Sequence, residues 1–150
     1  MSAESISESP ERTAEIAASF ARELEPGDMV LLTGEVGAGK STFVRAVLTE
    51  LGVEGAIPSP TFTIGRLYEG EGELRLSHLD LYRIGSIADE DPGLFDEYLD
   101  PSGIAFVEWP GEDSPELMGR AGRSCEVALA HLDRDRREIR ISPFSGPASD

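Results

Sequence analysis

With 150 residues, the chain is long enough to bury one hydrophobic core, and this length predicts a single domain. Its formal net charge of −16 opposes contact with a phosphate backbone, which argues against a protein that binds nucleic acid unaided. No apolar run approaches the roughly 18 residues of a membrane span, the polar N-terminus predicts no signal peptide, and the lone cysteine, Cys125, excludes an internal disulfide. We therefore expect a cytoplasmic protein without membrane contact.

The N-terminal part of the chain predicts a disordered segment followed by a helix. Residues 1–8 are rich in serine and glutamate, a composition that favours disorder. Ser9-Pro10-Glu11 then has the form of an N-cap, a first helical residue and an acidic first turn. Apolar residues follow at helical spacing as far as Leu24, and Pro26-Gly27 ends the helix.

The stretch from Val30 to Thr42 reads as a strand, a glycine-rich loop and a helix. We expect the strand over 28–33 and the helix over 40–51. The pattern between them, Gly34-x-x-x-x-Gly39-Lys40-Ser41, is that of a phosphate-binding loop in its required setting. The simpler alternative is a glycine-rich turn before a helix, but Lys40 is the only lysine in a chain with twelve arginines.

Each part of this loop has a chemical reason to bind ATP. Its glycines let successive backbone N–H groups converge on a phosphate, and the helix N-terminus adds a favourable dipole. Lys40 would reach the β- and γ-phosphates, and the Ser41 hydroxyl would be a ligand of Mg²⁺. The residues expected to contact the nucleotide are Gly34, Glu35, Val36, Gly37, Ala38, Gly39, Lys40, Ser41 and Thr42.

The remainder of the chain predicts strands separated by loops. An extended segment through Tyr68 leads into a hairpin loop at 69–73 and a return strand at 74–80. Residues 104–107 are apolar throughout, which is typical of a buried central strand. The other expected elements are a short helix near 94–99, a brief helix at 117–118, a final hairpin of 125–132 and 137–142, and a frayed tail at 145–150. With a single domain over 9–144, the sequence predicts an α/β, three-layer P-loop NTPase-like fold with a mixed central sheet.

Two acids follow predicted strands and are candidates for catalysis. P-loop enzymes need a carboxylate at the end of a neighbouring strand to organise Mg²⁺ and its water molecules. We assign Glu108 to Mg²⁺ and Asp80 to the attacking water or the γ-phosphate, with the reverse assignment open. The alternative for each is a solvated acid at a strand end. His78 is interpreted as a packed strand residue and not as a metal ligand.

Two threonines, Thr61 and Thr63, are candidates to sense the γ-phosphate as a switch, and the alternative is that they simply favour extended backbone. Trp109, the only tryptophan, is expected to pack in the core or at the edge of the site.

Four blocks of sequence together resemble the TsaE (YjeE-type) ATPases in order and spacing. They are Gly34–Thr42, Ser59-Pro60-Thr61-Phe62-Thr63, His78-x-Asp80-x-Tyr82-Arg83 and Val107-Glu108-Trp109-Pro110, and the resemblance spans about residues 9–142. It implies a small bacterial ATPase that serves the synthesis of threonylcarbamoyladenosine in tRNA. Such proteins bind the threonylcarbamoyl transferase (TsaD-type) and its paralogous partner (TsaB-type), and their ATP hydrolysis supports turnover.

The resemblance also implies roles for individual residues. Segments 59–63 and 80–83 would be switch-like, Glu108 would help to hold Mg²⁺, Arg137 would lie near the nucleotide, and Thr13 would lie near the adenine. The chain departs from the family's usual pattern at 89–95, where a leucine-rich helix is replaced by Asp89-Glu90-Asp91-Pro92-Gly93-Leu94-Phe95. No direct contact with tRNA is expected from so acidic a chain.

Three other functions compete with this interpretation. A small-molecule P-loop kinase would need an arginine-rich lid, for which Arg134–Arg137 is the only candidate segment. A GTPase is disfavoured because the chain has no Asn-Lys-x-Asp motif. A nucleotide-gated interaction module with negligible hydrolysis is the third.

Overall fold

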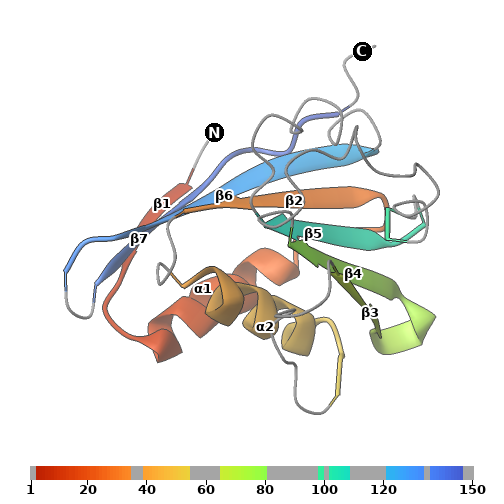
Figure 1. Ribbon diagram of the computed structural model, residues 1–150, viewed down its shortest axis with the longest axis horizontal. Coiled ribbons are helices and arrows are strands. Elements are labelled where there is room, and N and C mark those ends of the chain that lie inside the picture. The colour runs from red at the N-terminus through yellow and green to blue at the C-terminus, as the bar shows by residue number, and fades with distance from the viewer. Residues whose placement is uncertain are drawn as a thin grey trace.

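A seven-stranded sheet with two helices on one face makes up most of the described chain (Figure 1). The computed structural model describes residues 3–34, 39–54, 65–80, 98–99, 102–108, 121–133 and 136–146. The strands are β1 (Ala3–Ser7), β2 (Asp28–Thr33), β3 (Gly65–Glu69), β4 (Arg75–Asp80), β5 (Ile104–Glu108), β6 (Arg123–His131) and β7 (Arg137–Ile141). The helices are α1 (Pro10–Ala21) and α2 (Lys40–Glu50), and a short 3₁₀ turn, η1, covers Glu71–Glu73.

The sheet is mixed, with a parallel centre and antiparallel margins. Its strand order is β1-β7-β6-β2-β5-β4-β3. The four central strands β6, β2, β5 and β4 pair in parallel, whereas the β1–β7, β6–β7 and β3–β4 pairs are antiparallel. The predicted α/β class with a mixed central sheet is therefore confirmed, as are the two hairpins at 65–80 and 123–141.

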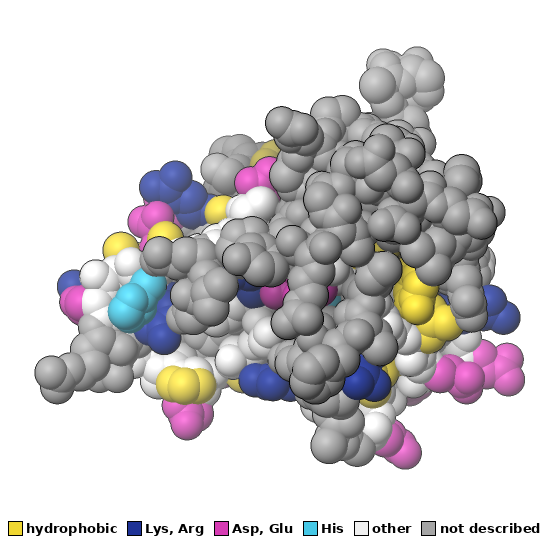
Figure 2. Space-filling view, in the orientation of Figure 1, with side chains coloured by type: hydrophobic (Ala, Val, Ile, Leu, Met, Phe, Trp, Pro, Cys, Tyr) yellow, Lys and Arg dark blue, Asp and Glu magenta, His cyan; other side chains and the backbone are white. Residues whose placement is uncertain are grey.

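Charged side chains are spread over the surface that the structure describes. Figure 2 shows basic side chains of the described residues dispersed among acidic ones on one face of the molecule. Several arginines form ion pairs: Arg12 with Glu15, Arg22 with Glu50, Arg123 with Asp28, Arg136 with Asp133 and Arg140 with Glu138. Within the described residues, neither helix is long and apolar enough to cross a membrane.

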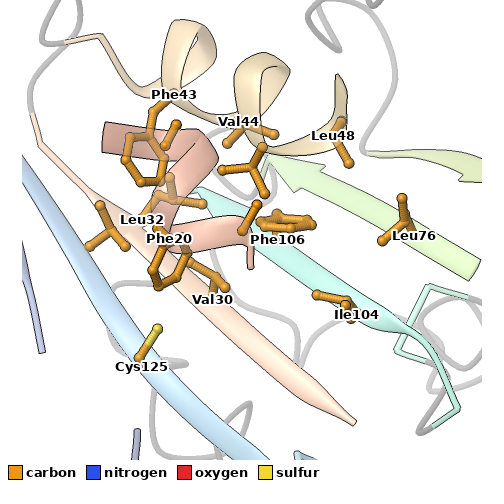
Figure 3. Packing of buried hydrophobic residues seen from close by; sticks show 14 of the residues in the cluster. Phe20, Val30, Leu32, Phe43, Val44, Leu48, Leu76, Ile104, Phe106 and Cys125 are labelled. Carbon is orange, nitrogen blue, oxygen red and sulfur yellow. The ribbon is translucent and has the colours of Figure 1, made fainter. Parts of the chain in front are cut away.

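The larger core lies between the helices and the sheet, because alternate residues of each strand face α1 and α2. Val30 and Leu32 of β2 point to this face, while Met29 and Leu31 point to the other. Phe43, Val44 and Leu48 of α2 are fully buried against the sheet (Figure 3), and Val47 of the same helix is also fully buried. On the opposite face Tyr98, Leu99 and Ala121 pack against Met29, Leu31, Leu79, Ala105 and Val107.

Cys125 is part of the larger core, where its side chain packs as a small apolar group. Burial raises the pKa of its thiol to about 12, so the thiol stays protonated at neutral pH.

The predicted start of α1 and the predicted bounds of β2 are confirmed, whereas α1 ends at Ala21, before the predicted stop at Pro26-Gly27. Ser9 is the N-cap of α1 and its Oγ accepts a hydrogen bond from the backbone N–H of Arg12 at 3.1 Å. Strand β2 covers 28–33 as expected. Of the helix predicted near 94–99 only Tyr98 and Leu99 are described, and the helix predicted at 117–118 lies outside the described residues.

The prediction that residues 1–8 are disordered is wrong for Ala3–Ser7. This segment is β1, which pairs with β7 from Ala3–Ile141 to Ser7–Arg137. An edge strand needs one hydrogen-bonding neighbour and few apolar side chains, so a polar sequence can form it. The tail is also held at its start, because Ser145 and Ser124 exchange two backbone hydrogen bonds of 2.9 Å.

A buried ion pair ties the amino end of β2 to β6. The Arg123 guanidinium donates to both carboxylate oxygens of Asp28, at 2.8 and 2.7 Å, and the Asp28 side chain is 1% exposed. The same guanidinium lies 4.1 Å from the ring centroid of Phe144, which stacks on Phe20. The C-terminal segment is thus attached to α1 and the sheet through one arginine.

Arg123→Ala should lower the free energy of unfolding by about 2–3 kcal/mol, because it leaves the Asp28 carboxylate buried without its main donor. This is below the usual range of about 3–5 kcal/mol for breaking a fully buried pair, since Arg123 is 33% exposed. Urea denaturation measures the change. The control is Arg136→Ala, whose pair with Asp133 is half exposed and should add nothing measurable. Equal losses in the two variants would contradict this account.

Candidate nucleotide-binding site

Among the described residues, Glu108 and Asp80 of the predicted site lie at one edge of the sheet because the central strands are parallel. Strands β2, β5 and β4 end side by side, with Leu32 opposite Glu108 and Glu108 opposite Asp80. In open α/β sheets, ligands bind outside the carboxyl ends of such strands. Registered neighbours in a sheet share a face, so Glu108 and Asp80 lie on the same face as Leu32, the face that α2 covers.

The glycines at the two ends of the loop adopt backbone conformations that other residues avoid. Gly34 has φ = 138°, and Gly39, the N-cap of α2, has φ = 102° and ψ = 14°. Gly39 has no side chain to cap the helix, so the first N–H groups of α2 keep their capacity to bind an anion. The conformation of Gly39 and the uncapped start of α2 are therefore compatible with phosphate binding at this helix N-terminus.

Lys40 is held inside the fold at the start of α2. Only 5% of the residue is exposed, and its Nζ donates a hydrogen bond of 2.6 Å to the carbonyl oxygen of Gly34. Burying an ammonium group is costly unless its charge is compensated. Lys40 lies against the first glycine of the loop, so its ammonium group could contact a phosphate bound in the loop.

Glu108 is equally buried, and a histidine holds it. The residue is 4% exposed, and its Oε2 lies 2.5 Å from Nε2 of His78, which is 2% exposed. Asp80, the next residue on the same face of β4, is partly buried. Carboxylate and hydroxyl oxygens are the ligands that Mg²⁺ prefers, so Ser41 and Glu108 fit this ion. The described residues contain no cluster of three or more His, Cys, Asp or Glu side chains able to hold a metal ion, and Mg²⁺ in nucleotide sites uses few protein ligands.

Of the two residues implicated only by resemblance, Arg137 lies beside the loop, and Thr13 is connected to it through Ser7. A Cβ added to Gly39 would lie 4.0 Å from Nε of Arg137, so that guanidinium is beside the loop. Arg137 pairs with Ser7 across β7 and β1, and Ser7 Oγ lies 2.7 Å from Thr13 Oγ1. Thr13 is thus linked to the start of β7 through Ser7.

The structure brings together Gly34, Gly39, Lys40, Ser41, Thr42, Asp80, Glu108 and Arg137. The loop centre, Glu35–Ala38, and the switch candidate Thr61 lie outside the described residues, as do Thr63, Arg83 and Trp109.

Two polar residues at the site were not predicted. Ser7 was assigned to a disordered segment, and His78 to packing alone. The spacing of His78 and Asp80 carried a signal, because residues two apart on a strand share a face.

Comparison with known proteins gives one consistent result. The family model described as threonylcarbamoyl adenosine biosynthesis protein TsaE matches residues 7–139. The chain is 44% identical to a tRNA threonylcarbamoyladenosine biosynthesis protein TsaE of Bacillus subtilis, over 87% of this chain and 78% of the relative. It is 37% identical to the protein of that name from Aquifex aeolicus, over 92% of this chain and 94% of the relative.

Among solved structures, the chain is similar to a crystal structure of Bacillus subtilis YdiB. The two have a TM-score of 0.76 and 29% sequence identity, and the match covers 97% of this chain and 87% of that one.

Thr13→Val should separate a structural role of this hydroxyl from a role in nucleotide binding. Loss of the hydrogen bond to Ser7 should lower the free energy of unfolding by about 1 kcal/mol. If Thr13 lies near the adenine, affinity for ATP should fall while affinity for inorganic triphosphate stays unchanged. Calorimetric titration with both ligands measures this, and Thr49→Val on the exposed face of α2 is the control. Equal losses for the two ligands would exclude a position near the adenine.

Proposed function

The chain belongs to the TsaE family of threonylcarbamoyl adenosine biosynthesis proteins, and from this premise we propose that it is a Mg²⁺-dependent ATPase of that pathway. It binds ATP in the loop between β2 and α2. Hydrolysis is slow in the isolated protein and depends on partner proteins, the threonylcarbamoyl transferase (TsaD-type) and its paralogue (TsaB-type). The ATPase resets this transferase complex, and the chain itself transfers no threonylcarbamoyl group.

The observation that carries the proposal is the position of Lys40. The only lysine of the chain is buried at the N-terminus of α2, with Nζ 2.6 Å from the carbonyl oxygen of Gly34. A lysine that serves only solubility keeps its charged group in water, and many surface positions would suit it. A buried lysine next to the glycine-rich loop is instead placed to make a charge-assisted hydrogen bond to phosphate.

The role of Mg²⁺ follows from charge. The chain already carries −16, and ATP adds further negative charge at a place lined by Glu108 and Asp80. Ser41 and Glu108 would hold the ion, which when bound neutralises the β- and γ-phosphates. Asp80 orients the attacking water, and Arg137 contacts the nucleotide from β7.

Contact with tRNA would run through the partners. Phosphate backbones are bound by clustered lysine and arginine, and the basic side chains in Figure 2 are dispersed among acids. Arginines such as Arg22 and Arg140 are already paired with glutamates. The partner complex must then supply the basic surface that holds the tRNA.

Lys40→Met should weaken binding of Mg·ATP by roughly 10- to 100-fold, the loss expected for a hydrogen bond to a charged group. The unliganded protein should still fold, because methionine keeps the volume of the buried side chain. Calorimetry and thermal unfolding give the two quantities.

Arg45→Met is the matched control, since Arg45 lies on the exposed side of the same helix. Unchanged ATP affinity in Lys40→Met would remove the phosphate-binding role of the loop.

The isolated protein should give no tRNA gel shift at physiological salt, and should bind the transferase pair more tightly with ATP than without it. Asp80→Asn should weaken the effect of ATP on partner binding, because residues 80–83 are proposed to report the nucleotide state. Asp133→Asn in the exposed β6–β7 turn is the control. Micromolar tRNA binding by the protein alone, or partner binding indifferent to ATP, would contradict the proposal.

A further inference from the structure

His78 and Glu108 form a buried polar pair between the neighbouring strands β4 and β5. The two side chains are 2% and 5% exposed, and Nε2 lies 2.5 Å from Oε2 although the residues are 30 positions apart in sequence. Their neighbours on the same face of β4 and β5 are Leu76 and Phe106, both fully buried and apolar. Two polar side chains thus follow apolar ones on this face, next to the edge of the sheet that carries the candidate nucleotide-binding site.

The hydrogen bond defines which nitrogen carries the proton. An ionised carboxylate only accepts, so Nε2 of His78 is the donor to Glu108. Within the described part of the chain, Nδ1 of the same ring is buried without a partner. A buried polar atom without a partner costs stability, and an apolar residue would avoid that cost. A buried histidine with an unpartnered nitrogen is expected where the function of the protein requires that side chain.

The sheet register places His78 on the core side of Glu108, away from the edge of the sheet that carries the candidate site. His78 pairs with Phe106, two residues before Glu108, while Asp80 pairs with Glu108 itself. One strand therefore supplies both Asp80 beside the carboxylate and a donor that reaches the carboxylate from the core side. The bond to Oε2 restricts rotation of the Glu108 carboxylate and does not involve its other oxygen, and a carboxylate oxygen can accept from or ligate a second group.

We propose that His78 is a positioning residue, which fixes the orientation of Glu108 and so determines the affinity of the site for the Mg²⁺ that accompanies ATP. This inference rests on the proposed function of Glu108. Groups that orient a metal-binding side chain typically change metal affinity or activity by about 10- to 100-fold when they are removed.

Two amide substitutions test the inference with closely matched side chains. In His78→Gln the amide nitrogen takes the place of Nε2 and still donates to Glu108. In His78→Asn it takes the place of Nδ1 and does not reach Glu108. We expect His78→Gln to bind ATP in the presence of Mg²⁺ within about threefold of the wild type, and His78→Asn to bind it roughly 10- to 100-fold more weakly. Without Mg²⁺, the three proteins should bind ATP with similar affinity.

A merely structural histidine predicts a different result. The thermal unfolding temperature of His78→Asn without ligand would then be lower than that of the wild type. Its affinity for ATP would be lower as well, both with and without Mg²⁺. That outcome, or equal Mg²⁺ dependence in the two variants, would overturn the inference. If the wild type itself gains no ATP affinity from Mg²⁺, the proposed function fails and the inference fails with it.

The wild-type protein offers a test that requires no variant. Long-range ¹H–¹⁵N correlation spectra of the His78 ring should show the proton on Nε2. A proton on Nδ1 alone would mean that Glu108 accepts nothing from His78, and would overturn the inference even if both variants failed to fold.

Discussion

Parallel pairing of β2 with β5 is the constraint on which the candidate site depends. It aligns Leu32 with Glu108, so the loop that follows β2 and the acid that ends β5 reach the same edge and the same face. The helix α2 then runs back over that face, with Lys40 at the edge and Phe43 to Leu48 over the core. An antiparallel β5 would place its last residue at the opposite edge, far from the loop. The chemistry of the site thus follows from strand direction before any side chain is considered.

The two ends of the parallel sheet use buried charge differently. At the amino end, Asp28 is fully satisfied by Arg123 and by the backbone N–H of Glu25, and the pair attaches the C-terminal segment. At the carboxyl end, Lys40 and Glu108 are buried next to glycine backbone and to His78. The first arrangement gives a closed hydrogen-bond network, as stability requires. The second leaves His78 Nδ1 without a partner in the described part of the chain, as in sites where local stability is sacrificed to ligand binding.

The parts of the molecule that could be predicted from the sequence are those that local signals specify. The Ser9-Pro10 start of α1, strand β2, the loop glycines and the apolar run before Glu108 each have a nearby cause in capping, periodicity or backbone conformation. Strand β1 was missed because its serines and glutamates resemble a disordered segment, and only pairing with β7 orders them. The bond between His78 and Glu108 was missed because two strands bring together residues 30 positions apart. Arg137 was identified by family resemblance alone, since nothing in its local sequence predicts a position beside Gly39.

The central claim is that one edge of the sheet binds Mg²⁺ and ATP through the loop and Glu108 together. A crystal structure of the protein with Mg²⁺ and a non-hydrolysable ATP analogue tests it most directly. The account predicts the β- and γ-phosphates against the backbone of 34–41, Lys40 Nζ turned from Gly34 to phosphate, and Mg²⁺ between Ser41 and Glu108. Phosphates bound elsewhere, such as in the cavity of about 370 Å³ lined by Leu67, Tyr98 and Ile104, or Mg²⁺ remote from Glu108, would contradict it.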